Sequence, residues 1–303
     1  MSETGVMRRA ARLLAACLLL VQPLPVSAKG PGISPIALAT LGSGELLVLD
    51  SRRGLFVIDP RSGQVRALVS GFGAFGAADM AVSPSSQGDT ILVSMGVPQP
   101  QGMLARVVRY NRAGKSTGEW GWFGLGSEPV QPGGLAIDAQ RSVAYVVNSR
   151  RPSVYRFDLN RPGTRPAEFA TIRGAKNLGP LVLDAKRSRL LVGDPFLGTV
   201  HAVDLASRKS QLLFRGLGEP YAFLIDTAGD RLFIADASGE RVLVVGLTDK
   251  ASAVTTFAKL SKFSDPHALA FGADGNLWVG DEDEETLLLV SPKGVLLRTI
   301  SLD

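Results

Sequence analysis

Short apolar runs that end in a polar residue recur along this chain. The fullest copy of the pattern is DPHALAFGADGNLWVGD, from Asp265 to Asp281. An apolar run is followed there by a Gly-rich turn and by a second apolar run that closes on an aspartate. This pattern predicts two short strands joined by a tight turn. The second run recurs in five other places, where it ends at Asp50, Met95, Asn148, Asp194 and Asp236.

The spacing of these runs predicts a repeat architecture. Successive run ends lie 45, 53, 46, 42 and 45 residues apart. A period in the forties with several short strands per unit is typical of β-propellers. The chain divides into six units with four short apolar segments each, and no segment shows sustained helical periodicity. We therefore predict an all-β fold, a six-bladed β-propeller of four-stranded antiparallel blades.

Residues 1–28 have the pattern of a secretory signal peptide. Three arginines within residues 8–12 form a basic start, residues 13–21 an apolar core, and residues 26–28 a small-residue cleavage site. The apolar core is shorter than the roughly 20 residues that a membrane-spanning helix needs. We expect cleavage after Ala28, a periplasmic or secreted protein without a membrane span, and a single propeller domain over residues 29–303.

The only cysteine, Cys17, lies inside the predicted signal. Residues 14–17 resemble a lipoprotein box, but Arg12 leaves almost no apolar stretch ahead of the cysteine, so we expect no lipid anchor. The mature chain then forms no disulfide, and its stability must come from the burial of apolar side chains. Hydrophobic residues make up 45% of the sequence, which is enough for a substantial core.

The charge balance argues against nucleic acid as a partner. The chain has 33 Lys and Arg residues against 28 Asp and Glu residues, a formal net charge of +5. No basic run is longer than two residues, whereas a nucleic-acid-binding face needs clustered basic side chains. We expect no nucleic-acid partner.

Propeller geometry indicates which residues line the mouth of the central channel. In each blade the start of the innermost strand and the end of the second strand meet on one face. The start positions are Ile36, Ala78, Gly133, Gly179, Tyr221 and His267, with Asp79 as the alternative to Ala78. The end positions are the six run ends given above. Among these residues we expect Tyr221, His267, Asn148, Asp194 and Asp236 to bind a ligand.

The stretches GNLWVGD and DRLFIADASGERVLVV resemble NHL-repeat propellers and their six-bladed relatives, and the resemblance covers nearly the whole mature chain. Those relatives include the SMP-30/gluconolactonase family of metal-dependent lactonases and the virginiamycin B lyase family. The pattern implies the fold more specifically than an activity. The lactonases hold their metal with Glu, Asn and Asp at the starts of the inner strands. Those positions offer no carboxylate here unless Asp79 is shifted into register, so we expect neither a metal site nor a cofactor.

The resemblance to the lyases is carried by Pro266-His267 and Asp281. It implies that His267 is a general base and that Asp281 orients its ring, since imidazole titrates near neutral pH. The lyases have a second functional histidine at about the position of Tyr221. The other histidine of this chain, His201, is predicted to lie in a third strand, away from the channel.

Several side chains keep two interpretations open. The strand-end aspartates either gather a cation or cap the following turns by accepting backbone N–H bonds, and the second role is the commoner one. The acidic run Asp281 to Glu285 is predicted to lie on the same face as the arginine pairs at residues 52–53 and 150–151. Either these charges polarise the mouth face, where the acidic run could bind a cation, or the run is a solvated loop. Trp120 and Trp122, which stand among glycines, either anchor a ligand or partner or pack as an outer strand.

These features predict a binding role for this protein. We expect a small molecule, a peptide or a protein partner at the channel-mouth face. The alternative is an enzyme, a lyase or lactonase acting on a cyclic ester with His267 as general base. A purely structural interaction scaffold is a third interpretation.

Overall fold

The computed structural model describes residues 32–83, 88–100, 102–123, 130–226, 228, 230–248 and 253–303. The predicted signal peptide lies outside these ranges. Gly32–Asp303 forms one compact unit, which consists of strands and a short 3-10 helix, η1, at Ala185–Arg187. Within the described ranges, no helix has the length and apolarity needed to cross a membrane.

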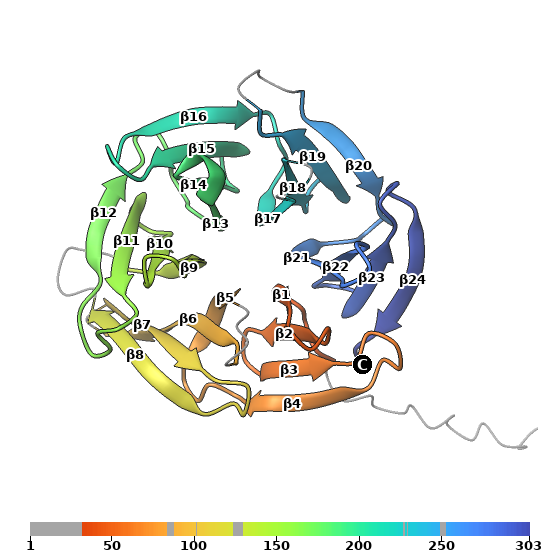
Figure 1. Ribbon diagram of the computed structural model, residues 1–303, viewed down its shortest axis with the longest axis horizontal. Helices are drawn as coiled ribbons and strands as arrows, with labels where there is room; N and C mark the ends of the chain where they lie inside the picture. The colour runs from red at the N-terminus through yellow and green to blue at the C-terminus, as the bar shows by residue number, and fades with distance from the viewer. Residues whose placement is uncertain are drawn as a thin grey trace, which may run out of the picture. The chain divides into compact units, whose positions relative to one another are not determined.

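Six four-stranded antiparallel sheets are arranged as blades around a central channel (Figure 1). In every blade the strands follow one another from the channel to the rim. The first two blades contain β1 (Ala37–Thr40), β2 (Leu46–Asp50), β3 (Gly54–Ile58), β4 (Val65–Ser70), β5 (Gly76–Ser83), β6 (Thr90–Gln99), β7 (Gly102–Tyr110) and β8 (Ser116–Phe123). The next two contain β9 (Pro132–Asp138), β10 (Val143–Asn148), β11 (Ser153–Asp158), β12 (Ala167–Thr171), β13 (Leu181–Asp184), β14 (Arg189–Asp194), β15 (Thr199–Asp204) and β16 (Ser210–Arg215). The last two contain β17 (Pro220–Asp226), β18 (Arg231–Asp236), β19 (Arg241–Gly246), β20 (Thr255–Lys259), β21 (Pro266–Phe271), β22 (Leu277–Asp281), β23 (Thr286–Val290) and β24 (Leu296–Ser301).

The predicted six-bladed propeller is therefore confirmed, and the structure explains why the second strands gave the clearest sequence signal. All five residues of β2 are buried. Leu47 and Leu49 pack toward the second blade, whereas Leu46 and Val48 pack toward the sixth. Because neighbouring blades cover both faces of such a strand, it has no polar face, and its sequence is a continuous apolar run.

The hydrophobic core is divided into layers between the blades. The described residues form six buried apolar clusters, and each cluster joins side chains of two adjacent blades. Every blade therefore depends on both neighbours to bury its two faces. A propeller of this kind is stabilised by the closed ring more than by any one blade.

The ring closes where the first and sixth blades meet. The sixth blade consists of β21 to β24, so within the described chain no N-terminal strand completes it. The N–H of Ile33 donates to the carbonyl of Leu302 over 3.1 Å. Both side chains are buried in the cluster that joins the two blades. A short backbone contact and face-to-face packing thus hold the ends of the propeller together.

Candidate functional site

A cavity of about 330 Å³ lies at the mouth of the channel, where the inner strands begin. We call it the mouth cavity. Its wall includes Tyr221, His267 and Glu282 on one side, and glycines and prolines of the third and fourth blades on the other. The expected ligand residues Tyr221 and His267 therefore do line one cavity.

A β-bulge at the start of the inner strands turns single residues out of the ladder. Pro266 pairs with Asp281 and Ala268 with Gly280, which leaves His267 without a partner in the ladder. Tyr221 in β17 occupies the same unpaired position. In β5 the unpaired residue is Ala78. This register makes Ala78 the start position of the second blade and places Asp79 one residue farther along the strand. Bulges commonly redirect side chains toward sites in this way.

The six start positions make the mouth strongly asymmetric. Ala78, Gly133 and Gly179 leave the second to fourth blades nearly without side chains there, and Ile36, Tyr221 and His267 fill the other half. The glycines are required by the packing of the blades. A Cβ on Gly179 would lie 2.8 Å from the Pro195 ring, and one on Gly133 would lie 2.8 Å from the Ser149 hydroxyl. The space over these blades is consequently a built-in property of the ring.

Both ring nitrogens of His267 face carboxylates. Its Nδ1 contacts Oε2 of Glu282, and its Nε2 lies 3.7 Å from Oδ1 of Asp265. The Nε2 atom is buried and has no hydrogen-bond partner. The Tyr221 ring packs edge-on against the imidazole, with 4.1 Å between the ring centroids and an interplanar angle of 70°. His267 is thus fixed on three sides.

This environment favours the protonated form of His267. Burial by itself lowers the pKa of the imidazole, but the hydrogen bond with Glu282 and the charges of Glu282, Asp265 and Asp283 together raise the pKa above its ordinary value of 6.5. Burial also raises the pKa of Asp265, although the charge of His267 opposes that shift. When it is protonated, the ring is an imidazolium ion between two carboxyl groups, and the group carries a net negative charge when both carboxyls are ionised.

The expected pairing of Asp281 with His267 is not the one that the structure forms. Asp281 is 1% exposed, and its Oδ1 accepts the backbone N–H groups of Asp265 at 3.1 Å and Glu284 at 3.2 Å. Glu282, the next residue in the chain, orients the imidazole instead. Sequence reasoning missed Glu282 because it considered only the last residue of each strand. The residue that follows the strand end is the one that lines the mouth cavity.

The other strand-end residues are corrected in the same way. Asn148, Asp194 and Asp236 are completely buried rather than open to a ligand. The carboxylate of Asp194 accepts the backbone N–H groups of Lys176, Asn177 and Leu197. Asn148 and Asp236 accept backbone N–H groups in equivalent places. Asn148 and Asp194 thus tie the segment before an inner strand to the loop after the second strand, and Asp236 holds the segment before β17, which is the capping role.

Trp120, one of the two tryptophans expected to anchor a ligand or partner, is not at the surface. Trp120 is fully buried, and its indole N–H lies 3.0 Å from the carbonyl of Asp158 and 2.9 Å from that of Arg161. Its ring packs at 5.1 Å from Phe157 in the next blade. Trp120 is therefore a core residue and not a ligand anchor. The side chain of Trp122 lies outside the described residues.

The acidic run after β22 is largely engaged within the protein. Asp281 caps the loop and Glu282 holds His267, as described above. Oε2 of Glu285 accepts the N–H of Gly32 at 3.0 Å. Across the mouth, Nε of Arg150 donates to Gln131 at 2.8 Å, and Arg151 lies 3.5 Å from Glu168. Asp283 and Glu284 remain as exposed acids on this face.

One group of residues has the composition of a metal site, although the sequence predicted none. Asp265, His267 and Glu282 each bring one ligand atom to within 4.8 Å of the others. One imidazole nitrogen and two carboxylate oxygens form a donor set that Zn²⁺ or Mn²⁺ accepts. A bound cation would take the place of the Nδ1 proton through which His267 contacts Glu282.

Comparisons with known proteins bear on the fold. No protein-family model and no curated protein matches the chain. The chain is similar to a structure of a nidogen/laminin complex, with 14% identity and a TM-score of 0.65 over 85% of this chain and 93% of the other. A streptogramin B lyase gives 11% identity and a TM-score of 0.63 over 91% and 85%. A catalytically inactive virginiamycin B lyase from Staphylococcus aureus with quinupristin gives 12% and 0.61 over 89% and 85%. At these identities the likeness establishes a propeller fold that this chain shares with a lyase and with a protein of a protein–protein complex.

Proposed function

We propose that this protein binds a small molecule or a short peptide segment in the mouth cavity. The observation that carries the proposal is the asymmetry of the ring. Side chains are nearly absent over the second to fourth blades, while Tyr221 and the His267–Glu282 pair form a polar wall opposite them. A concave site with a few convergent polar groups is the usual form of a ligand pocket.

The charge of this wall favours a ligand with a positive group or several N–H donors. Asp265 and Glu282 flank a single imidazolium, and Asp283 adds a further negative charge to the loop. Tyr221 is 42% exposed and offers an aromatic surface beside these carboxyls. A cation at this place gains from both the carboxylates and the ring.

Binding accounts for the geometry of His267 better than catalysis does. A general base must direct a free nitrogen at the proton that it removes. Here Nδ1 is held by Glu282, and Nε2 is buried toward Asp265. The raised pKa also shifts the ring toward its protonated form, which cannot act as a base. A lyase or lactonase acting on a cyclic ester is the second candidate, favoured by the carboxylate that fixes the ring, and it would require the imidazole to turn toward the cavity.

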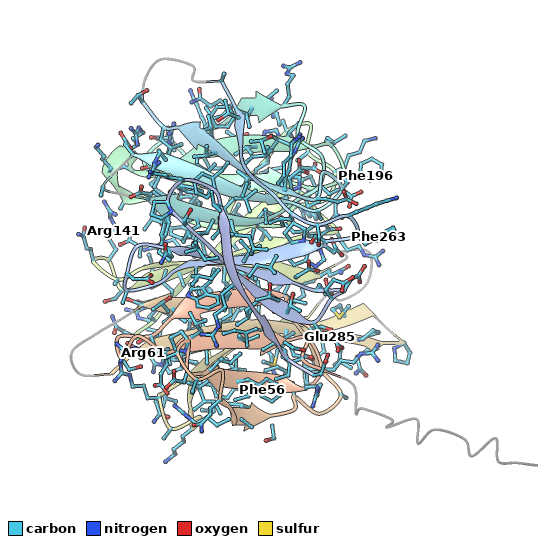
Figure 2. The ribbon with its side chains drawn as sticks, turned by 90° about the vertical axis from the view of Figure 1, so that its right-hand side faces the viewer. Phe56, Arg61, Arg141, Phe196, Phe263 and Glu285 are labelled. Atoms are coloured by element: carbon cyan, nitrogen blue, oxygen red, sulfur yellow. The ribbon has the colours of Figure 1, made fainter. Side chains whose placement is uncertain are left out.

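A protein partner is a further candidate for the same face. Phe196 is 68% and Phe263 69% exposed, and both lie on the side of the molecule that carries Glu285 (Figure 2). Phe263 also has a φ of 77°, a conformation that a bulky side chain rarely adopts. Exposed aromatics of this kind are common in binding surfaces.

We also propose that the protein acts outside the cytoplasm after removal of residues 1–28. The basic, apolar and small-residue segments at the start of the chain support this location. The intact mass of the exported protein would then correspond to a chain that begins at Lys29 without lipid. A chain that begins at a diacylated Cys17 would contradict the proposal.

The proposed function is tested with a panel of small amines, cationic peptides and cyclic esters. Binding is measured by calorimetry and turnover by product analysis, for the wild type and for Tyr221→Ala and Glu282→Gln. We expect binding without turnover, and a loss of affinity for cationic ligands in both variants. Glu284→Gln in the same loop is the matched control and should bind as the wild type does. Turnover of a cyclic ester that His267→Ala abolishes would establish the enzyme instead.

A further inference from the structure

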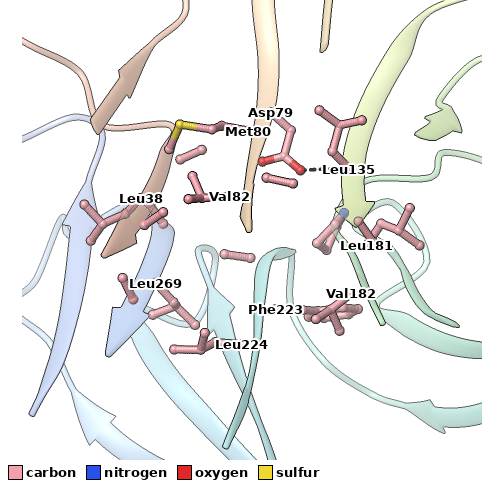
Figure 3. Close-up of a pocket in the computed structure, with 18 of the residues that line it drawn as sticks. Leu38, Asp79, Met80, Val82, Leu135, Leu181, Val182, Phe223, Leu224 and Leu269 are labelled. Atoms are coloured by element: carbon pink, nitrogen blue, oxygen red, sulfur yellow. Dashed lines mark hydrogen bonds between the residues drawn. The ribbon is translucent and has the colours of Figure 1, made fainter. Parts of the chain in front are cut away.

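The channel below the mouth is a second, larger space. A cavity of about 490 Å³ extends along the inner strands (Figure 3). Five residues line both this channel cavity and the mouth cavity, namely Ile36, Asp79, Pro180, Tyr221 and His267. The two cavities therefore meet at these five residues, which we call the junction.

The channel wall is apolar along most of its length. Val82, Val182, Phe223, Leu224 and Leu269 are among the side chains that line it (Figure 3). The ionisable side chains of this lining are Asp79, Tyr221 and His267, and all three lie at the junction. The ionisable groups of the wall therefore lie at its mouth end, and the rest of the wall consists of apolar side chains together with the hydroxyl groups of Thr40 and Ser83.

Asp79 departs from the repeat pattern of the blades. It follows the bulge residue of β5, and the corresponding residues of the fifth and sixth blades are Ala222 and Ala268. An alanine therefore satisfies the packing at this position. Oδ2 of Asp79 accepts the N–H of Leu135 at 2.7 Å (Figure 3), and no described Lys, Arg or His side chain forms an ion pair with it. The fold leaves a carboxyl group without a cationic partner at the top of an apolar channel.

We propose that the channel binds an amphiphilic amine, with its ammonium group beside Asp79 and its hydrocarbon chain along the apolar wall. This inference rests on the proposed function, because it adds a ligand class to the same site. An ammonium ion supplies the missing partner of the carboxylate, whereas a carboxylate ligand would repel it. The hydrocarbon chain lies against apolar side chains, where the polar groups of another ligand would lose their hydrogen bonds to water without finding new partners.

Removal from water raises the pKa of Asp79 to about 7, against the opposing effect of the Leu135 and Met80 N–H groups. The ionisable groups that face it across the junction are Tyr221 on β17 and His267 on β21. The adjacent strands β1 and β6 contain no ionisable side chain, Asp138 lies at the far end of β9, and Asp50 at the end of β2 bonds to backbone N–H groups. Binding of an ammonium ion at pH 6 should therefore release a proton from Asp79.

The test measures the binding of linear probes to the protein and compares amines, alcohols and carboxylates of equal chain length. Calorimetry is performed with n-butylamine, n-hexylamine and n-octylamine and with the matching alcohols and carboxylates. We expect affinity to rise about fourfold for each added methylene. We expect each amine to bind at least about tenfold more tightly than its alcohol, a preference of the size that a charge-assisted contact supplies. At pH 6, heats measured in buffers of different ionisation enthalpy should show proton release.

Asp79→Asn keeps an oxygen for the Leu135 N–H and should remove both the amine preference and the proton release, while the gain per methylene remains. Glu284→Gln, which neutralises an exposed acid of the mouth loop, is the matched control and should retain the full preference. Equal affinity of octylamine and octanol for the wild type, or affinity independent of chain length, would overturn the inference. If short cationic ligands still lose affinity in Glu282→Gln in that case, the proposed function stands; if no ligand responds to either variant, both fail.

Discussion

The carboxyl group of Asp79 makes a strong prediction about stability and pH. Its pKa rises from 3.8 to about 7 in the folded protein because the group is withdrawn from water. The unfolded chain loses this proton near pH 4, whereas the folded chain keeps it up to about pH 7. Over that interval the folded state binds more protons, so the free energy of unfolding must fall as the pH rises. Above pH 7 both states are ionised and the decline ends.

The magnitude follows from the size of the shift. A shift of about three pKa units corresponds to about 4 kcal/mol at 1.36 kcal/mol per unit. Asp79→Asn cannot ionise, yet its side-chain oxygen can still accept the Leu135 N–H. We therefore expect the variant to match the wild type near pH 4 and to exceed it by up to about 4 kcal/mol at pH 8. This would be a large part of the stability of a typical domain, about 5 to 15 kcal/mol.

Urea denaturation at pH 4, 6 and 8 measures this difference. Asp283→Asn, which removes an exposed carboxyl, serves as the control and should leave the difference from the wild type small at every pH. A variant Asp79→Asn that is no more stable than the wild type at pH 8 would refute the reasoning. The carboxylate would then be solvated or paired in a way that the described contacts do not show.

Three further predictions concern His267, the loop caps and ring closure. Glu282→Gln should lower the pKa of His267 toward or below 6.5 in an NMR titration. In the wild type, the raised pKa of His267 stabilises the folded state at low pH, and this stability is lost as the pH rises through the pKa that His267 has in the folded protein; the variant should lack it. An unchanged pKa would show that Glu282 is not the partner of His267. Asp194→Ala leaves three backbone N–H groups without their acceptor and should cost about 1 to 3 kcal/mol or more in urea denaturation, whereas Asp283→Ala should cost little. Deletion of Val295–Asp303 removes β24 and the two buried side chains of Ile300 and Leu302, a loss of roughly 3 to 6 kcal/mol; a truncated protein that melts like the intact one would contradict the closure described here.

The propeller could be predicted from the sequence because its second strands are covered on both sides. Leu46 to Leu49 are all buried by the adjacent blades, so the sequence signal is continuous and repeats in every blade. The inner strands give a weaker signal, since they face a channel on one side. The register of β5 was left open at Ala78 or Asp79 for this reason, and the bulge decides it.

The site could be predicted only in part. The pattern placed Tyr221 and His267 at the mouth, where both line the cavity, because the geometry of an inner-strand start repeats from blade to blade. It pointed to Asp281 where Glu282 acts, since the strand-end residue turns inward to cap a loop and the next residue turns outward. No sequence pattern marks Asp79 as exceptional until the register shows alanines in its place in other blades. Such assignments depend on contacts between blades, which a single sequence does not encode locally.

The most direct test of ligand binding at the mouth is a crystal structure of the protein soaked with 4-bromobenzylamine. The anomalous signal of bromine locates the apolar end of this probe without ambiguity. We predict one strong bromine peak within the joined mouth and channel cavities, with the amine close to Asp79 or Glu282. Bromine peaks confined to the outer surface, with both cavities free of the probe, would contradict the binding function proposed for this propeller.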